Sequence, residues 1–132
     1  MVIDTSAVLA ILHDEPERLK FSEALEDADV RCMSDASFVE TSMIIESRYG
    51  SDGVRDLDLL IAKAAIVLAA VDAEQAHLAR QAFRLYGKGR HPAGLNFGDC
   101  FSYALARFSA EPLLFKGKDF SRTDIECHPS SG

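Results

Sequence analysis

Met1-Val2-Ile3-Asp4-Thr5-Ser6-Ala7-Val8-Leu9-Ala10-Ile11-Leu12 opens the chain with a short apolar run, a polar break and a second apolar segment. The first run predicts a strand over residues 1–3. The second predicts a helix after Ser6, because its apolar residues recur at helical spacing. Asp4 therefore stands where the first strand ends and the first helix begins.

The same alternation continues along the chain. Further strands are predicted over residues 30–33, 65–71, 112–115 and, at an edge, 125–127. Further helices are predicted after Pro16 and over residues 35–49, 54–64, 72–86 and 98–108, the second of these ending at Gly50. The run over residues 65–71 is interpreted as a buried strand. Short apolar strands alternating with amphipathic helices indicate an α/β fold with a mostly parallel sheet and helices on both faces.

Length and composition indicate one domain over residues 1–132. The chain has 132 residues, 48% of them hydrophobic and 27% charged, which suffices for a core of its own. Its three cysteines form no C-x-x-C pair, so neither a disulfide framework nor a cysteine zinc site is expected and a reducing cytoplasm is predicted. The longest apolar run, residues 64–71, is too short to span a membrane, and no targeting segment is recognised.

The formal net charge of −7 disfavours non-specific binding to nucleic acid, which needs basic side chains facing the phosphates. Grouping of the basic residues can offset this charge. Two such groups are present in the sequence: Lys88, Arg90 and His91, followed by Lys116, Lys118 and Arg122. The first group lies in the loop over residues 87–94, which is either a solvated turn or a surface that contacts RNA.

Two acidic residues follow predicted strands. Asp4 comes directly after the first strand, and Asp119 follows residues 112–115 after a short turn. Ligands of open parallel sheets bind beyond the carboxyl ends of the strands, so both are candidate site residues. The alternative interpretations are a helix cap for Asp4 and an ordinary turn residue for Asp119.

Two further acids lie on predicted helices. Glu40 has apolar neighbours three and four residues away: Ala36, Met43 and Ile44. A carboxylate within such a stripe requires a cation or a basic partner, unless it lies exposed at the stripe's edge. Asp99 lies in the first turn of its helix, three residues after Asn96, where capping alone would also explain it.

Four carboxylates brought close together would raise one another's pKa unless a cation held them. Oxygen ligands without cysteine or paired histidine suit Mg²⁺ or Mn²⁺. Such an ion polarises a phosphoryl oxygen and lowers the pKa of a bound water, which is the chemistry of phosphodiester hydrolysis.

Other chemistries find little support. The sequence has no G-x-x-x-x-G-K-[ST], H-E-x-x-H or G-x-S-x-G motif. One alternative is a phosphatase or phospho-acceptor domain, although such proteins usually pair two acids after the first strand and here Asp4 is followed by Thr5 and Ser6. Another is a non-catalytic protein-binding module that docks a basic segment in its acidic pocket.

Four segments together resemble the VapC toxins, a family of PIN-domain ribonucleases, and the match runs nearly end to end. They are Val2-Ile3-Asp4-Thr5-Ser6, Glu40 within a helix, Leu95-Asn96-Phe97-Gly98-Asp99-Cys100, and Leu113-Leu114-Phe115-Lys116-Gly117-Lys118-Asp119-Phe120. The order and spacing of all four acids make the resemblance specific. Lys118 departs from the pattern, because many relatives carry an acidic or small residue there.

The resemblance implies a three-layer α/β/α sandwich with about five strands and a Mg²⁺- or Mn²⁺-dependent endoribonuclease that acts as the toxin of a toxin–antitoxin pair. It implies catalytic roles for Asp4, Glu40, Asp99 and Asp119. The first three would bind the metal, and Asp119 would orient the attacking water or support a second ion.

The resemblance also assigns further roles. Thr5, Ser6 and Asn96 would be supporting polar residues, and Lys88, Arg90 and Lys118 are candidate RNA contacts. The implied partners are a second copy of the chain and a VapB-type antitoxin, which would also make any regulatory contact with DNA. No sequence-specific DNA binding by this chain itself is expected.

Overall fold

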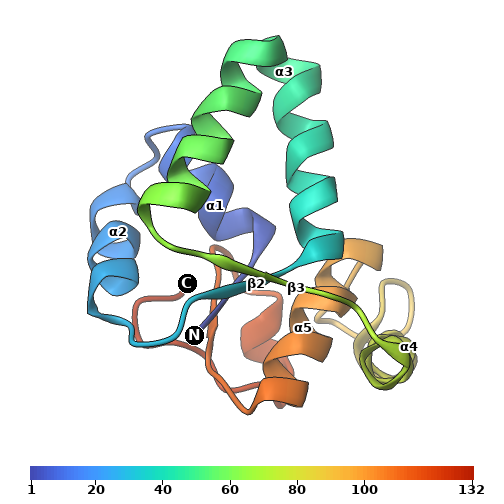
Figure 1. Cartoon of the computed structure of the whole chain (residues 1–132). Coiled ribbons are helices and arrows are strands. Elements are labelled where there is room, and N and C mark those ends of the chain that lie inside the picture. The colour runs from blue at the N-terminus through green and yellow to red at the C-terminus, as the bar shows by residue number, and fades with distance from the viewer.

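A computed structural model describes all residues, 1–132 (Figure 1). Its elements are β1 (Val2–Ile3), α1 (Thr5–Leu12), α2 (Arg18–Asp27), β2 (Cys32–Ser34), α3 (Asp35–Lys63), β3 (Val67–Ala69), α4 (Ala73–Tyr86), α5 (Phe97–Ser109), β4 (Leu113–Leu114) and the 3₁₀ turn η1 (Phe120–Arg122). The predicted alternation of strands and helices is confirmed.

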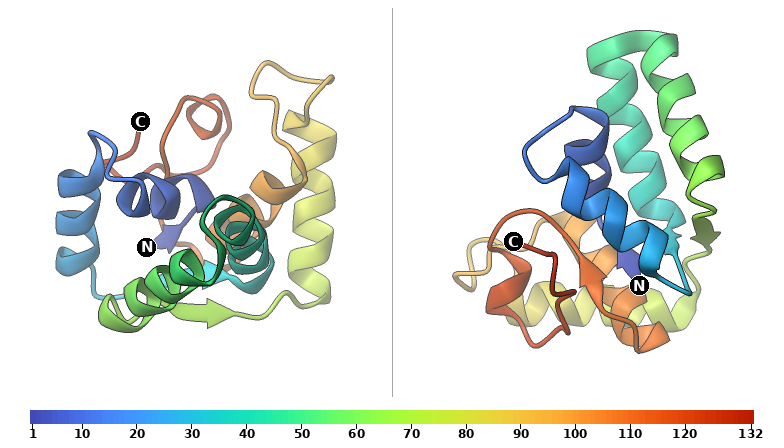
Figure 2. Two further views of the ribbon diagram at one scale, coloured as in Figure 1. Left: turned by 90° about the horizontal axis from the view of Figure 1, so that it is seen from above. Right: turned by 90° about the vertical axis from the view of Figure 1, so that its left-hand side faces the viewer.

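The four strands form one parallel sheet in the order β3-β2-β1-β4. Successive side chains of a strand point to opposite faces, and the core divides accordingly. Val2 packs on one face with residues of α4 and α5, whereas Ile3 packs on the other with residues of α1, α2 and the end of α3. The two helical layers on either side of the sheet confirm the three-layer α/β/α architecture (Figure 2).

The long helix α3 consists of two limbs that form a hairpin (Figure 1). Gly50 separates them with φ 66° and ψ −153°, a conformation that strongly favours glycine. The prediction that the first helix ends at Gly50 is confirmed. The second limb begins earlier than the predicted residue 54, because the helix resumes directly after this break.

Two expectations about the sheet need correction. The third strand is not buried: Val67 and Leu68 are 64% and 39% exposed, because β3 lies at the edge of the sheet. The segment over residues 125–127 forms no full strand and meets β4 in a single parallel bridge, Leu113 to Cys127. The sheet therefore has four strands and a bridged fifth segment.

None of the helices combines the length and the apolar character needed to cross a membrane.

Candidate functional site

Asp4 lies at the carboxyl end of β1, where it is only 4% exposed. Its Oδ2 accepts hydrogen bonds from the backbone N and the Oγ of Ser6, at 3.0 and 2.6 Å. Its Oδ1 accepts from Ser102 Oγ at 2.5 Å. Asp4 therefore caps α1, as the alternative interpretation proposed, and is also held from a second side by α5.

Two further contacts extend this network. Ser6 Oγ accepts a hydrogen bond from Lys116 N at 3.0 Å, which joins the end of β4 to the start of α1. Ser102 Oγ lies 3.2 Å from Ser37 Oγ on α3. Both oxygens of the Asp4 carboxylate are thus fixed by neighbours that are themselves held in place.

Glu40 reaches the same region from the first limb of α3. Its Oε1 accepts a hydrogen bond from Thr5 Oγ1 at 3.0 Å, and Thr41 Oγ1 donates to Thr5 Oγ1 at 3.0 Å. Burial raises the pKa of Glu40, and the charge of Asp4 adds to the effect, whereas the hydrogen bond from Thr5 opposes it.

The surroundings of Glu40 differ from the predicted apolar stripe. Met43 is 65% exposed, and the buried residues of this limb are Ser37, Thr41 and Ile45. Glu40 is half-buried because α5 approaches closely at Gly98, where an added Cβ would overlap the Glu40 carboxylate. The basic partner that was one expectation for Glu40 is not found: Thr5 donates a hydroxyl hydrogen bond to it, and no base pairs with it.

Asp99 and Asn96 form a reciprocal capping box at the start of α5. Asp99 N donates to Asn96 Oδ1 at 2.9 Å, and Asn96 N donates to Asp99 Oδ2 at 3.0 Å. Burial raises the pKa of Asp99 to about 7, and the charges of Asp4, Asp119 and Glu40 contribute, while the bond from Asn96 N opposes the shift. The capping hydrogen bonds at the start of α5 therefore orient the Asp99 carboxylate, but they leave the charges of Asp4, Glu40 and Asp119 uncompensated.

Asp119 is the most exposed of the four acids. It occupies the N-cap position of η1, but its side chain makes no capping hydrogen bond. Its charge raises the pKa of Asp99, so the turn after β4 places it in the same neighbourhood. The structure therefore places the four acids that the sequence singled out in one region, although no three of them converge on a single point.

No lysine, arginine or N-terminal amine forms an ion pair with any of these four carboxylates. Lys116, whose backbone N donates to Ser6 Oγ beside Asp4, pairs through its side chain with Glu15 and Glu17 instead. Neighbouring acids contribute to the raised pKa of Glu40 and of Asp99, and grouped carboxylate oxygens without a resident base are the donor set that a hard dication prefers. No three acidic, histidine or cysteine side chains converge closely enough to hold an ion by themselves, so an ion bound here would be held by one or two carboxylates and otherwise through water.

The candidate RNA contacts are Lys118, next to Asp119 in the chain, and two residues of the loop over residues 87–94. Lys88, Arg90 and Lys118 are exposed and form no ion pair. The loop that carries Lys88 and Arg90 is closed by hydrogen bonds between Lys88 N and Leu95 O and between Leu95 N and Tyr86 O, both 2.9 Å. Arg122 Nη1 donates to Pro92 O at 3.0 Å and so ties this loop to η1.

Sequence reasoning missed three residues of the site: Gly98, Ser102 and Thr41. Ser102 carried a signal, because it lies one helical turn after Asp99 on an otherwise apolar segment. Gly98 also carried one, since a glycine in the first turn of a helix weakens the helix unless close packing requires it. Thr41 gave none, because its role depends on where α1 lies.

Comparisons with known proteins agree with this geometry. The sequence matches the PIN domain family over residues 1–126. It is 59% identical over 125 residues to "Ribonuclease VapC" of Mycolicibacterium smegmatis, covering 95% of this chain and 97% of that protein.

Two solved structures share the fold. The toxin VapC20 of Mycobacterium tuberculosis, described as cleaving the sarcin–ricin loop, superposes with a TM-score of 0.75 at 16% identity over 94% of this chain and 95% of that one. A toxin–antitoxin complex from Klebsiella pneumoniae gives 0.67 at 15% identity over 99% and 94%. The matched family and the extent of the identity show that this chain belongs to the PIN-domain family and, within it, to the VapC ribonucleases.

Proposed function

We propose that this chain is a Mg²⁺- or Mn²⁺-dependent endoribonuclease, the toxin of a toxin–antitoxin pair. The observation that carries the proposal is the group of four carboxylates, Asp4, Glu40, Asp99 and Asp119, gathered without any basic partner at one end of the sheet. A bound dication would neutralise these charges, polarise a phosphoryl oxygen of RNA and lower the pKa of a water molecule.

In this proposal the chain's own residues hold and orient the reacting groups. Asp4, Glu40 and Asp99 bind the ion directly or through water, and the hydrogen bonds from Ser6, Ser102, Thr5 and Asn96 keep their carboxylates in position. Asp119 has no capping bond to satisfy, so it is free to orient the attacking water and accept its proton. Attack of this water on phosphorus breaks the bond to the 3′-oxygen and leaves a 5′-phosphate and a 3′-hydroxyl.

The direct test is cleavage of end-labelled total RNA by the purified protein with Mn²⁺ or with EDTA, beside an Asp99→Asn control. Discrete fragments that require both the metal and Asp99 would support the proposal. Intact RNA in every lane, from protein free of any co-purified inhibitor, would contradict it and favour a non-catalytic binding module.

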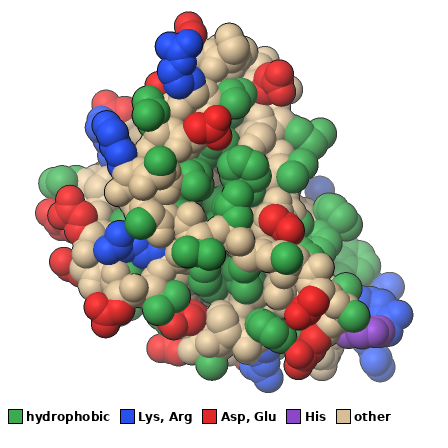
Figure 3. Space-filling view, viewed as in Figure 1, with side chains coloured by type: hydrophobic (Ala, Val, Ile, Leu, Met, Phe, Trp, Pro, Cys, Tyr) green, Lys and Arg blue, Asp and Glu red, His purple; other side chains and the backbone are tan.

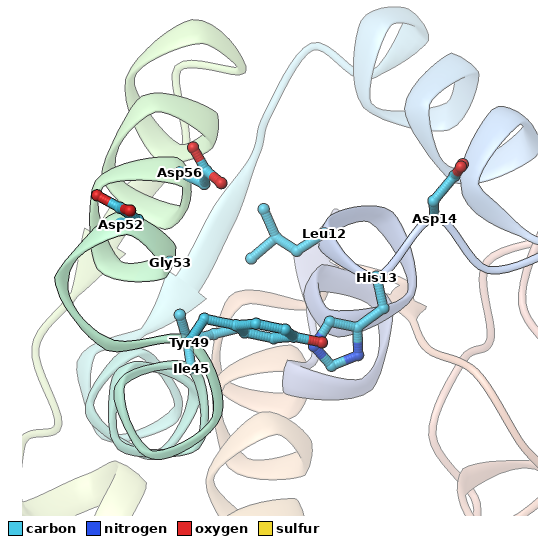
Figure 4. A pocket seen from close by; sticks show the side chains of 8 residues that line it. All are labelled: Leu12, His13, Asp14, Ile45, Tyr49, Asp52, Gly53 and Asp56. Atoms are coloured by element: carbon cyan, nitrogen blue, oxygen red, sulfur yellow. The ribbon is translucent and has the colours of Figure 1, made fainter.

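We propose that the antitoxin binds in a groove between α1 and α3 (Figure 4). The groove has a volume of about 410 Å³, and its floor includes Leu12, Ile45 and the His13 and Tyr49 rings, whose centroids lie 5.4 Å apart. Three carboxylates also line it: Asp52 and Asp56, which form no ion pair, and Asp14, which pairs with Arg18 at 2.9 Å. An amphipathic helix with basic residues beside its apolar stripe is complementary to such a groove.

This assignment is tested by measuring the binding of a VapB-type antitoxin that inhibits the chain. Replacing both Asp52 and Asp56 by Lys is expected to weaken its binding while RNA cleavage in its absence stays unchanged. If the double variant bound the antitoxin as tightly as the wild-type chain does, this groove would be excluded as the antitoxin-binding site.

We further propose that the chain forms a homodimer in a reducing cytoplasm. Exposed apolar side chains gather over β3 and the first limb of α3, where Val39, Met43 and Val67 are 53%, 65% and 64% exposed (Figure 3). An exposed apolar edge strand is a surface that pairs with another chain.

All three cysteines are unpaired, which accords with the proposed reducing compartment. Sedimentation of the protein and of a Val67→Lys variant tests the dimer, because a monomeric wild-type chain would contradict it.

A further inference from the structure

A second groove lies between α4 and α5 and is almost entirely apolar. Its volume is about 420 Å³, and it is lined by Ala76, Ala79 and Phe83 of α4 and by Phe97 and Phe101 of α5, with Arg80 at its edge. Phe97 is 80% exposed, the largest exposed fraction of any large hydrophobic side chain in the protein. Its ring meets the Phe101 ring edge-on, with centroids 4.9 Å apart.

This groove adjoins the acidic site through the first turns of α5. Phe97 and Phe101, four residues apart, share one face of the helix, whereas Gly98 and Ser102 face Glu40 and Asp4 on another. Asp99, in the first turn, lies beyond Gly98 and Ser102, on the far side of α5 from Phe97 and Phe101. An α-helix with its side chains is about 10 Å across, so a polymer that crosses the start of α5 can reach the carboxylates and the groove at once.

Basic side chains without carboxylate partners lie at the groove or close to it in the chain: Arg80 lines it, Arg90 contacts the lining residue Phe83, and Arg84 and Lys88 are sequence neighbours of these residues. Arg80, Arg84, Lys88 and Arg90 form no ion pair, although the chain as a whole has a formal charge of −7. The guanidinium of Arg90 lies over the Phe83 ring, 5.2 Å from its centroid. Figure 3 shows Lys, Arg and His side chains gathered on the side of the molecule where α4 lies.

We propose that the groove between α4 and α5 is a subsite for a nucleobase of single-stranded RNA, adjacent to the phosphate that is cleaved, with Phe97 as the stacking surface. The proposal rests on the proposed ribonuclease function and names how that site holds its substrate. Unstacked bases of single-stranded RNA bind on aromatic rings and arginine planes, while nearby cations bind the phosphates. An apolar protein segment would fill the groove but leave the four cations unpaired, whereas RNA satisfies both.

The chain has no tryptophan, so a single introduced tryptophan reports on this surface alone. The test uses Phe97→Trp in an Asp99→Asn background, so that RNA stays uncut, and a matched Phe108→Trp protein. Phe108 lies on the same helix near its other end and is 43% exposed. Titration with a single-stranded oligoribonucleotide in Mg²⁺ is expected to quench the emission at position 97 in a saturable manner and to leave position 108 unchanged.

In otherwise wild-type protein, Phe97→Ala is expected to raise KM for the same RNA by about tenfold or more, with a much smaller change in kcat. Phe108→Ala should change neither. Emission at position 97 that RNA does not alter would overturn the subsite. Emission that is already blue-shifted without RNA and depends on protein concentration would overturn it in favour of a second copy in the groove. RNA cleavage by the wild-type protein distinguishes either result from failure of the proposed function, since only the latter abolishes cleavage.

Discussion

The carboxylate of Glu40 occupies the space that a Cβ atom on residue 98 would need. It can do so because residue 98 is glycine, which has no Cβ. An added Cβ would lie 2.5 Å from Glu40 Cδ, far inside normal contact distance. The first limb of α3 and the start of α5 can therefore approach closely enough to place Glu40 beside the turn that carries Asp99.

Gly98→Ala is expected to impair activity much more than stability. The clashing atoms are the end of a flexible side chain, so Glu40 can swing aside and the chain should still fold, with a stability change within about 1 kcal/mol. Displacement of the carboxylate should lower kcat for RNA cleavage by about a hundredfold. The measurements are cleavage kinetics and thermal unfolding of Gly98→Ala, of Glu40→Gln and of the double variant. If the substitutions act through the same carboxylate, the double variant should lose little more kcat than either single variant. Wild-type cleavage by Gly98→Ala would show that the position of Glu40 is unimportant.

Asp99→Asn is expected to stabilise the metal-free protein at neutral pH. The pKa of Asp99 rises to about 7 in the folded chain from a usual value of 3.8. The folded state therefore binds more protons than the unfolded state between these values, and wild-type stability falls as pH rises through this window. Asparagine removes the charge and can still accept the bond from Asn96 N.

Chemical denaturation with EDTA at pH 4 and at pH 8 measures this effect. The stability gain of Asp99→Asn should be near zero at pH 4 and about 2 kcal/mol at pH 8, after allowance for solvent screening. An equal gain at both pH values would show that the charge of Asp99 is not its cause.

Binding of Mn²⁺ is expected to raise Tm and to weaken as pH falls below about 7. The ion must compete with the proton on Asp99, whose pKa is raised to about 7 by burial and by the neighbouring acids. A ligand that binds only the folded state at 100 times its Kd should add about 2.7 kcal/mol to stability. Thermal unfolding at pH 6 and pH 8 checks both statements, and Asp99→Asn should abolish the pH dependence. A Tm that Mn²⁺ does not change would argue against a metal site.

Ser102→Ala is expected to lower both activity and stability. Ser102 Oγ donates to the buried Asp4 carboxylate at 2.5 Å, so its loss leaves that oxygen without this partner. Such a loss costs about 1–3 kcal/mol, and the less firmly held carboxylate should reduce kcat. Ser109→Ala is the matched control, because Ser109 lies on the same helix and donates only to Leu105 O, at 2.6 Å. Equal effects of the two substitutions would contradict a positioning role for Ser102.

Local pattern was enough to predict the order of the elements and to single out four acids as candidates. Asp4 and Asp119 follow apolar runs that became β1 and β4, and parallel strands place their carboxyl ends at the same edge. Gly50 and Asn96 end or begin helices for reasons of backbone conformation and capping that lie within a few residues of each.

The remaining features depend on contacts between distant segments. The apolar residues of β3 predict a buried strand. Only the order of the strands in the sheet shows that β3 is an edge strand, where Val67 is exposed to solvent. Met43 was expected to be covered, but no element packs over that part of α3, and it is 65% exposed. Ser102 and Thr41 join the site only because α5 and α1 bring them to Asp4 and Thr5.

Identification of the fragment ends produced from a defined RNA tests the central claim most directly. Attack by water within the four-carboxylate site predicts fragments with 5′-phosphate and 3′-hydroxyl ends, formed with Mn²⁺ and absent with EDTA or with Asp99→Asn. Fragments with 2′,3′-cyclic phosphate and 5′-hydroxyl ends, formed equally well in EDTA, would contradict hydrolysis by a metal-dependent acidic site.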